Sequence, residues 1–320
     1  MTPRQPQRGA ALLVAMLIVT LMATLAAGMV WQQWRAIEVE GAERARAQAG
    51  WLIEGTTDWA RIILREDARQ NSGKPMVDSP DENWGIPLRD VKLSDFLAAD
   101  RDNTQATDID AVLSGQITDA QARYNLRNLI NDEPEAAAKQ LKILRRLCEV
   151  LGLPQETAQR IAEGMNGASL AEEQLDDEED VTPGAPLPPQ RLEQLTWLGL
   201  DADAVRRLSP YVTILPGATP INVNTASPEV LSAVIEGLDR GTAERLTRTR
   251  PPGGYESLEA VKKQLPDKLT LEGTQVQVSS THFEIVGELR YDQYLLRERT
   301  LVQRRGLDVF VLRRERLTHE

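Results

Sequence analysis

The longest uncharged run of apolar residues in the chain lies close to its N-terminus. Residues Ala10–Val30 contain no charged side chain, and Arg4 and Arg8 come before them. About 20 apolar residues span the hydrocarbon core of a bilayer as a helix, in which every backbone group is satisfied internally. Because the basic residues precede the run, we expect the N-terminus to stay on the cytoplasmic side. The pattern predicts one transmembrane helix over residues 10–30.

The residues suited to proteolytic cleavage lie before this run. An ordinary signal peptide places its small residues after the apolar core, whereas here Gly9 and Ala10 stand between the basic leader and the helix. Cleavage after Gly9 would remove only the leader and keep the membrane helix. Ordinary secretory cleavage after the apolar run is the alternative.

The helical pattern continues beyond the membrane segment to about Arg69. No proline interrupts residues 31–69. Small and apolar residues recur there at alternating spacings of three and four, which places them on one stripe of a helix. We expect the upper half of this stripe to pack on a sheet and the lower half on neighbouring subunits. The stripe consists of Ala42, Ala45, Ala49, Leu52, Thr56, Trp59 and Ile63.

A basic leader ending in glycine, followed by an uncharged helix that becomes amphipathic, resembles the N-terminus of type IV prepilins and pseudopilins. The resemblance implies that a prepilin peptidase cuts between Gly9 and Ala10, and that Ala10 becomes the methylated first residue. The family usually has phenylalanine or methionine at that position, so Ala10 departs from its pattern.

The fifth residue of the expected mature chain is a second departure. Most pilins have glutamate there, whereas this chain has Val14. A carboxylate inside the bilayer costs roughly 2.5–3.5 kcal/mol on insertion scales and is kept where it has a partner, which in pilins is the N-terminal amine of the adjacent subunit. A subunit without this carboxylate fits the tip of an assembly. Its absence is typical of the general secretion pathway protein K family of minor pseudopilins.

A second motif that resembles protein K spans Gly115–Leu129 and follows a predicted strand at Ala111–Ile117. The family signature reads approximately G-x-I-x-D-x-Q-G-R-F/Y-N-L-N-N-L, and here Ala122 and Arg127 replace a glycine and an asparagine. We expect a turn in which Asp and Asn side chains bind nearby backbone groups. The matching residues are Asp119, Gln121, Arg123, Tyr124, Asn125, Leu126, Asn128 and Leu129.

From about residue 132 to residue 264 the pattern is helical. Pro134 suits a helix start and Gly152 a helix end. The next helix is expected from Pro154 to about Gly164. Two short helices are predicted in residues 189–211, with Trp197 among the inward side chains, whereas residues 70–110 have the composition of loops.

The last helices of this region begin near a recognisable phrase. Ser227-Pro-Glu predicts a helix N-terminus, with serine as the N-cap. The phrase from Ile221 to Ser227 resembles a helix-hairpin-helix or SAM-like unit, and is typical of the second such unit in protein K.

The same phrase supports a different class of protein. Competence DNA receptors follow it with a Gly-hydrophobic-Gly hairpin, whose backbone amides approach a phosphate. Here the hairpin runs from Gly237 to Gly241, and Asp239 stands where the second glycine would be. The net charge of -11 also argues against nucleic acid as a partner, because phosphate contact needs a basic face. A membrane-anchored DNA-uptake receptor and a minor pilin of a surface pilus remain the alternatives.

Alternation of apolar and polar residues returns after Val276. Strands are predicted at His282–Tyr291, Tyr294–Arg304 and Leu307–Arg313. Together with the strand at Ala111, they predict an α+β pseudopilin fold, in which a long N-terminal helix packs on an antiparallel sheet with a large inserted all-α domain of two SAM-like units. The expected segments are a leader (1–9), a transmembrane helix (10–30), the first part of the core (31–132), the insertion (133–271, with units at about 133–212 and 219–268) and the C-terminal strands (272–320).

Residue types suited to catalysis are scarce. Cys148 is the only cysteine and lies in an apolar helical run, so we expect a buried side chain. His282 and His319 are the only histidines, which argues against histidine triads and histidine-rich metal sites. We therefore expect the protein not to be an enzyme.

A continuous acidic run lies at Glu172–Asp180. Calcium takes six to eight oxygen ligands, and the resemblance implies that calcium is a candidate ligand, because protein K relatives bind it in their helical domain. The family's spaced acidic pattern is absent, and continuous acidic runs are usually solvated. The candidate ligands are Asp176, Asp177, Glu179 and Asp180.

The resemblance implies a minor pseudopilin at the tip of the type II secretion pseudopilus, which initiates assembly and supports export of folded proteins across the outer membrane. It implies several partners: the minor pseudopilins I, J and H, the prepilin peptidase, the inner-membrane assembly platform, and a secreted substrate or the outer-membrane secretin. We expect a single-pass protein of the bacterial inner membrane with its bulk in the periplasm.

Overall fold

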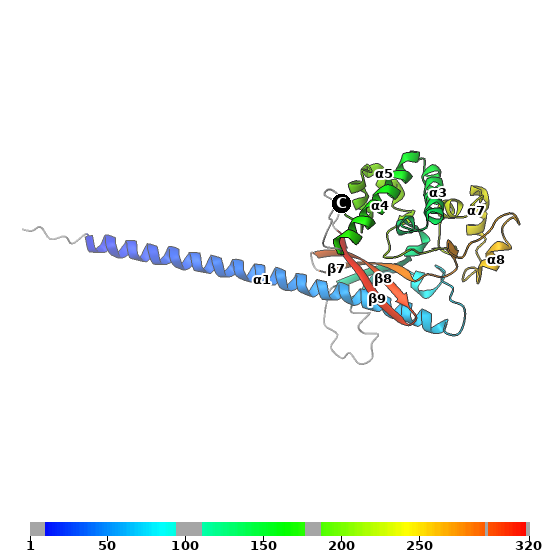
Figure 1. The fold of residues 1–320 in the computed structure, drawn as a ribbon. Coiled ribbons are helices and arrows are strands. Elements are labelled where there is room, and N and C mark those ends of the chain that lie inside the picture. The colour runs from blue at the N-terminus through cyan, green and yellow to red at the C-terminus, as the bar shows by residue number, and fades with distance from the viewer. Residues whose placement is uncertain (1–9, 94–110, 177–186, 292–293, 318–320) are drawn as a thin grey trace, which may run out of the picture. The chain divides into compact units, whose positions relative to one another are not determined.

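The computed structural model describes residues 10–93, 111–176, 187–291 and 294–317. The chain divides into two compact units, Met1–Glu54 and Gly55–Glu320. Helix α1 (Ala10–Gln70) begins in the first unit and ends in the second. The described part of the first unit consists of this helix alone (Figure 1).

The second unit contains a five-stranded antiparallel sheet with the order β1-β2-β7-β8-β9. Strands β2 and β7 pair along their whole length, from Ala111 opposite Tyr291 to Asp119 opposite Phe283. The predicted strands are confirmed, and β9 is longer than expected. The strands are β1 (Leu88–Lys92), β2 (Ala111–Asp119), β7 (His282–Tyr291), β8 (Tyr294–Arg305) and β9 (Asp308–Leu317).

The C-terminal part of α1 packs on one face of this sheet. Ala60 and Leu64 share a buried apolar cluster with side chains from β2, β7, β8 and β9, and Arg61 and Arg65 donate hydrogen bonds from Nε to backbone carbonyls of Val309 and Leu307 at 2.9 and 3.1 Å. The predicted helix on an antiparallel sheet is therefore present.

The buried stripe of α1 differs from the predicted stripe by one residue. Thr57, Ala60 and Leu64 are buried, whereas the predicted Trp59 and Ile63 are only partly covered. One residue rotates a helix by about 100°. The period of the pattern is right, and its phase is wrong because Trp59 and Ile63 line the rim of the helix–sheet contact.

All described helices other than α1 and η1 (Asn83–Gly85) lie in the chain between β2 and β7. They surround a second apolar core that includes Leu147, the predicted buried Cys148, Leu195 and Leu231. The elements of this helical region are η2 (Ala120–Ala122), β3 (Tyr124–Asn125), η3 (Leu126–Leu129), α3 (Pro134–Val150), α4 (Gln155–Asp176), η4 (Leu192–Leu198), α5 (Ala202–Leu208), β4 (Val212–Thr213), β5 (Ile221–Asn222), α6 (Pro228–Val234), α7 (Arg240–Arg248), α8 (Leu258–Lys262) and β6 (Val276–Gln277).

Two details of the helical region differ from the sequence-based expectation. Helix α4 does not end near Gly164 but continues to Asp176. A Cβ atom at Gly164 would lie 2.8 Å from both methyl carbons of Leu198, so this glycine allows close packing of α4 on η4. Trp197, expected to point inward, is 54% exposed, because η4 is a 3-10 helix and presents a different face from the predicted α-helix.

Candidate functional site

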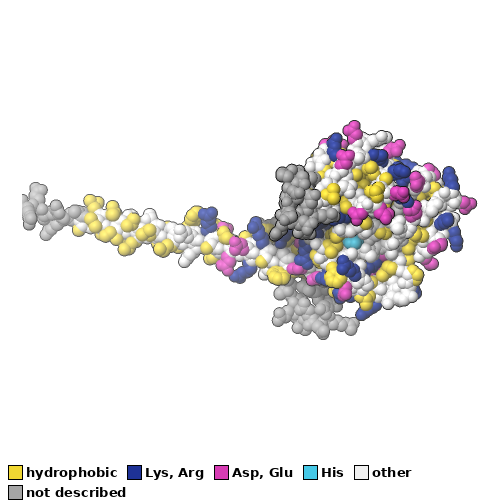
Figure 2. Space-filling view, viewed as in Figure 1, with side chains coloured by type: hydrophobic (Ala, Val, Ile, Leu, Met, Phe, Trp, Pro, Cys, Tyr) yellow, Lys and Arg dark blue, Asp and Glu magenta, His cyan; other side chains and the backbone are white. Residues whose placement is uncertain are grey.

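The apolar part of α1 is the first candidate site. The helix has mean hydropathy 2.4 over its most apolar 18-residue window, and that window has no buried residue. Figure 2 shows hydrophobic side chains along this part of the helix, with charged side chains gathering further along. By length and composition the helix is able to cross a membrane.

The expected cleavage site lies at the start of this helix. Gly9 lies outside the described residues, and Ala10 is the first residue of α1. Val14, in the second turn, is 56% exposed. The apolar face around Val14 is thus open to lipid or to other helices, and this turn carries no carboxylate.

The turn after β2 holds the family-like motif and is a structural junction. Asn125 donates from Nδ2 to the Gly217 carbonyl and to Thr219 Oγ1, at 2.7 and 3.1 Å. Its Oδ1 accepts from the backbone amides of Arg127 and Leu215, both at 3.1 Å. The prediction that motif Asp and Asn side chains bind backbone groups is confirmed, and the structure adds long-range partners that sequence spacing could not reveal.

Asp119 is the centre of a second part of this junction. Its Oδ2 accepts from Thr225 Oγ1 and Ser280 Oγ at 2.6 Å, and from Asn222 Nδ2 at 3.0 Å. Its Oδ1 accepts from the amide of Gln121 at 2.7 Å. Burial raises the pKa of Asp119, while these donors act to lower it. The network ties the end of β2 to the chain before β7, so the helical region is closed at its base.

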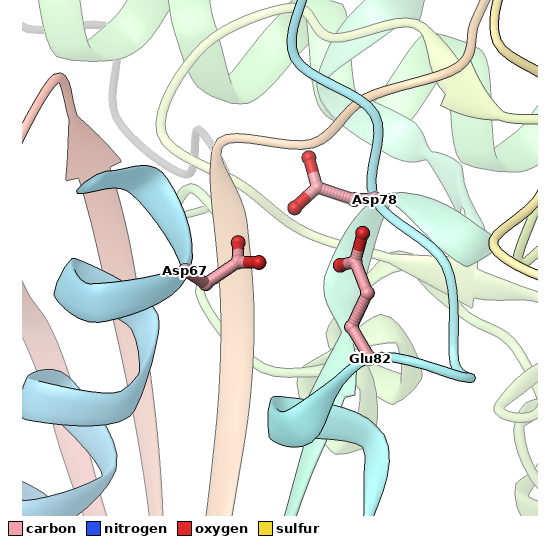
Figure 3. Close-up of side chains that lie close together, drawn as sticks. All are labelled: Asp67, Asp78 and Glu82. Carbon is pink, nitrogen blue, oxygen red and sulfur yellow. The ribbon is translucent and has the colours of Figure 1, made fainter. Parts of the chain in front are cut away.

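Three carboxylates converge where α1 ends (Figure 3). One oxygen from each of Asp67, Asp78 and Glu82 lies within 4.8 Å of the others. Arg304 on β8 lies against two of them: its Nη1 is 2.6 Å from Asp67 Oδ2, and its Nη2 is 2.5 Å from Asp78 Oδ1. Because the guanidinium already supplies the neutralising charge, this arrangement does not fit a divalent metal ion.

Local sequence pattern does not predict this cluster. The composition of residues 70–110 predicts loops, whereas the structure has η1 and β1 within that range. Burial, followed by the nearby charge of Asp67, raises the pKa of Glu82 to about 7, although a hydrogen bond from Trp84 opposes the rise. The cluster therefore couples charge to the fold of the second unit.

Only one of the expected calcium ligands lies among the described residues. Asp176 is the last residue of α4. Asp177, Glu179 and Asp180 lie outside the described residues. Calcium binding at this run stays a prediction.

The hairpin between α6 and α7 has a cap in the place where a phosphate would approach. Asp239 is the N-cap of α7, and its Oδ1 accepts from the amide of Thr242 at 2.9 Å. Arg240 pairs with Glu229 and Glu244 at 3.3 and 2.9 Å. A carboxylate thus occupies the anion-binding end of the helix, which disfavours the DNA-binding alternative.

An exposed apolar helix that continues into a segment packed on an antiparallel sheet defines the pilin-like class of membrane-anchored proteins. Family models described as "Type II secretion system (T2SS), protein K" match residues 122–217 and 221–279. The chain belongs to the type II secretion system protein K family, whose members are minor pseudopilins.

Individual relatives extend the match over most of the chain. It is 29% identical to type II secretion system protein K of Pectobacterium carotovorum subsp. carotovorum, over 98% of this chain and 97% of the relative. It is 28% identical to the protein of the same name in Pseudomonas aeruginosa, over 89% and 85%. A protein in the crystal structure of the GspK-GspI-GspJ complex from enterotoxigenic Escherichia coli has the same fold, with a TM-score of 0.66 at 18% identity over 87% of this chain and 99% of that chain.

Proposed function

We propose that this minor pseudopilin lies at the tip of the type II secretion pseudopilus, initiates its assembly and supports export of folded proteins across the outer membrane. The observation that carries the proposal is Val14, an exposed apolar residue near the start of α1. A subunit inside a pilin filament uses a carboxylate at this depth to receive the amine of its neighbour. A subunit with valine there has no such acceptor, so it suits the position at which no further subunit is added.

The leader and domain limits are part of the same proposal. Prepilin peptidase cuts between Gly9 and Ala10, which becomes methylated; α1 begins at Ala10. Residues 10–30 cross the inner membrane, and the rest of the chain lies in the periplasm. Residues 133–271 form the inserted domain of two SAM-like units, supported by the run of helices between β2 and β7.

The proposed partners are other minor pseudopilins, joined through α1 and the sheet. The solved structure with the same fold comes from a complex named GspK-GspI-GspJ, which supports proteins I and J as neighbours; protein H, the assembly platform and the secretin complete the proposed set. The helical region, at a tip with nothing stacked above it, is free to meet an exported substrate.

The first experiment is the intact mass of the full chain purified from membranes, with mapping of its N-terminal peptide. We expect a chain that starts at methylated Ala10, and a Gly9→Leu variant that remains uncut. A chain that starts near residue 30, or still at Met1, would overturn the processing part of the proposal.

The tip position needs its own test. In cells, Val14→Glu supplies the missing carboxylate, so we expect the variant subunit to appear within filaments instead of only at their ends, as seen by immunogold labelling. Unchanged labelling at the ends would contradict the role assigned to Val14. Loss of surface pili with normal secretion on deletion would instead indicate a pilus subunit, and salt-dependent DNA binding by the full chain would indicate a DNA receptor.

A further inference from the structure

A groove lies on the sheet face opposite α1. Val302 and Val309 point to the α1 side, where they pack with Leu64. Side chains alternate along a strand, and Leu301 accordingly points the other way and packs with Leu215 of the helical region. The seam between this face and the helical region is open, and we call it the β8–β9 groove.

One end of the β8–β9 groove is apolar. It has a volume of about 280 Å³ and is lined by Pro188, Ile214, Pro216, Leu301 and Leu312. The register of β9 against β8 shifts between Leu301 and Val302. This β-bulge leaves Leu312 as an additional residue and turns it toward the groove beside Arg313, which is a common use of a bulge on an edge strand. Leu312 remains 37% exposed.

The other end is lined by arginines. It has a volume of about 110 Å³ and shares Arg313 and Ile214 with the apolar end, so the two form one continuous seam. Over the whole groove, five arginines face three glutamates, in a protein whose net charge is -11. These residues are Arg123, Arg127, Arg191, Arg299, Arg313, Glu193, Glu284 and Glu315.

The ion pairs in this end do not use all the positive charge. Arg123 pairs with Glu284 at 2.8 Å, and Arg313 pairs with Glu315 at 2.8 Å. Arg299 lies 4.0 Å from both glutamates, and its buried Nε has no hydrogen-bond partner among the described residues. An unsatisfied buried donor is costly, so Arg299 is ready to receive an acceptor from outside.

We propose that the β8–β9 groove binds an extended, acidic segment of a partner polypeptide, with a carboxylate at Arg299 and an adjacent apolar side chain over Leu312. A carboxylate matches the surplus of positive charge, whereas a dianion such as phosphate would be repelled by Glu284 and Glu315. A single ion would also leave the apolar end empty, while an extended segment fills both ends. The groove does not involve α1, so this contact is independent of assembly through the helix.

The test uses the full chain in detergent micelles and the peptide Ser-Leu-Leu-Asp-Asp-Ser, labelled with a neutral dye. We expect saturable binding by fluorescence anisotropy that weakens as salt is raised. We expect the isosteric peptide Ser-Leu-Leu-Asn-Asn-Ser to bind at least about tenfold more weakly, which is the scale of one charge-assisted hydrogen bond.

Two variants in the groove have matched controls outside it. Arg299→Gln and Leu312→Glu should each weaken peptide binding about tenfold or more. Arg206→Gln and Leu307→Glu change exposed residues of the same types elsewhere, and should bind as the unmodified chain does. Thermal unfolding of each variant establishes that it is folded.

Three results would overturn the proposal. One is equal binding of the acidic and amide peptides, and another is unchanged binding by folded Arg299→Gln. The third is a tenfold gain in affinity when the acidic residues 176–180 are replaced by serine, because that gain would assign the groove to the chain's own acidic run.

Discussion

Arg304 holds Asp78 through a single nitrogen: Nη2 donates to both carboxylate oxygens, at 2.5 and 2.8 Å. Asp78 has no exposed surface, and its Oδ2 also accepts from the amide of Ser280 at 2.7 Å. Through Nη1 the same guanidinium reaches Asp67 in α1. One β8 side chain thus joins the end of the anchor helix, the loop after it and the base of the helical region.

Removal of Arg304 should strongly destabilise the second unit. Arg304→Gln leaves Asp78 buried without a counter-charge, and the loss of one partner from such a pair costs about 3–5 kcal/mol. We expect the free energy of unfolding, measured by denaturant titration, to fall by that amount. Arg305→Gln is the neighbouring control: Arg305 is exposed and its side chain hydrogen-bonds locally to Gln303, so its effect should stay within about 0.5 kcal/mol.

Stability should decrease as pH rises from about 4.5 to 7. Burial raises the pKa of Glu82 from 4.5 to about 7 in the folded protein. Between these values the folded state binds more protons than the unfolded state, so the free energy of unfolding falls as pH increases. The contribution of Glu82 should be about 1–3 kcal/mol over this window.

Glu82→Gln isolates this effect. Glutamine keeps the shape but cannot ionise, so the variant should lose most of the pH dependence and be the more stable chain at pH 8. The comparison is a series of thermal unfolding curves from pH 4.5 to pH 8 for both chains. Parallel curves for the two would show that the charge of Glu82 is not coupled to folding.

The motif turn should depend on the amide of Asn125. Asn125→Ala leaves the amides of Arg127 and Leu215 and the Gly217 carbonyl without this partner, at a cost of about 2–4 kcal/mol for the set. Asn131→Ala removes one exposed bond, to the amide of Glu133, and should cost about 0.5–1 kcal/mol. Equal losses of unfolding free energy in the two variants would refute the junction role.

Two glycines of α4 should respond in opposite directions to alanine. Gly164→Ala places a methyl group 2.8 Å from the Leu198 methyl carbons and should destabilise by about 1–3 kcal/mol. A Cβ atom added at Gly167 would meet nothing within 4 Å, so Gly167→Ala should stabilise by about 0.5–1 kcal/mol through helix propensity. Thermal unfolding of the pair tests whether Gly164 is a packing residue.

The elements with clear periodicity could be predicted from sequence. The limits of β7 agree with the alternation from His282 to Tyr291, and α6 begins at the predicted N-cap, Ser227. The end of α4 could not be predicted, because Gly164 serves contact with Leu198 rather than helix termination. A residue distant in sequence decides between those two uses of glycine.

The candidate site divides in the same way. The anchor helix and the motif turn follow from local pattern, since a membrane span depends on composition and an Asx turn on nearby backbone groups. The partners of Arg304 are 226 and 237 residues away in the sequence, and Arg304 lies in a strand whose alternation says nothing about charge partners. Such clusters appear only once the topology is known.

The pairing of β2 with β7 has a consequence for the order of folding. Asp119 and Phe283 are register partners, yet the whole helical region separates them in the chain. Closing so long a loop costs entropy before any strand contact returns it. We therefore expect the helical region to collapse first and to bring β7 within reach of β2, after which β8 and β9 complete the seat for the end of α1. The segment that enters the membrane earliest is thus the last to acquire its sheet.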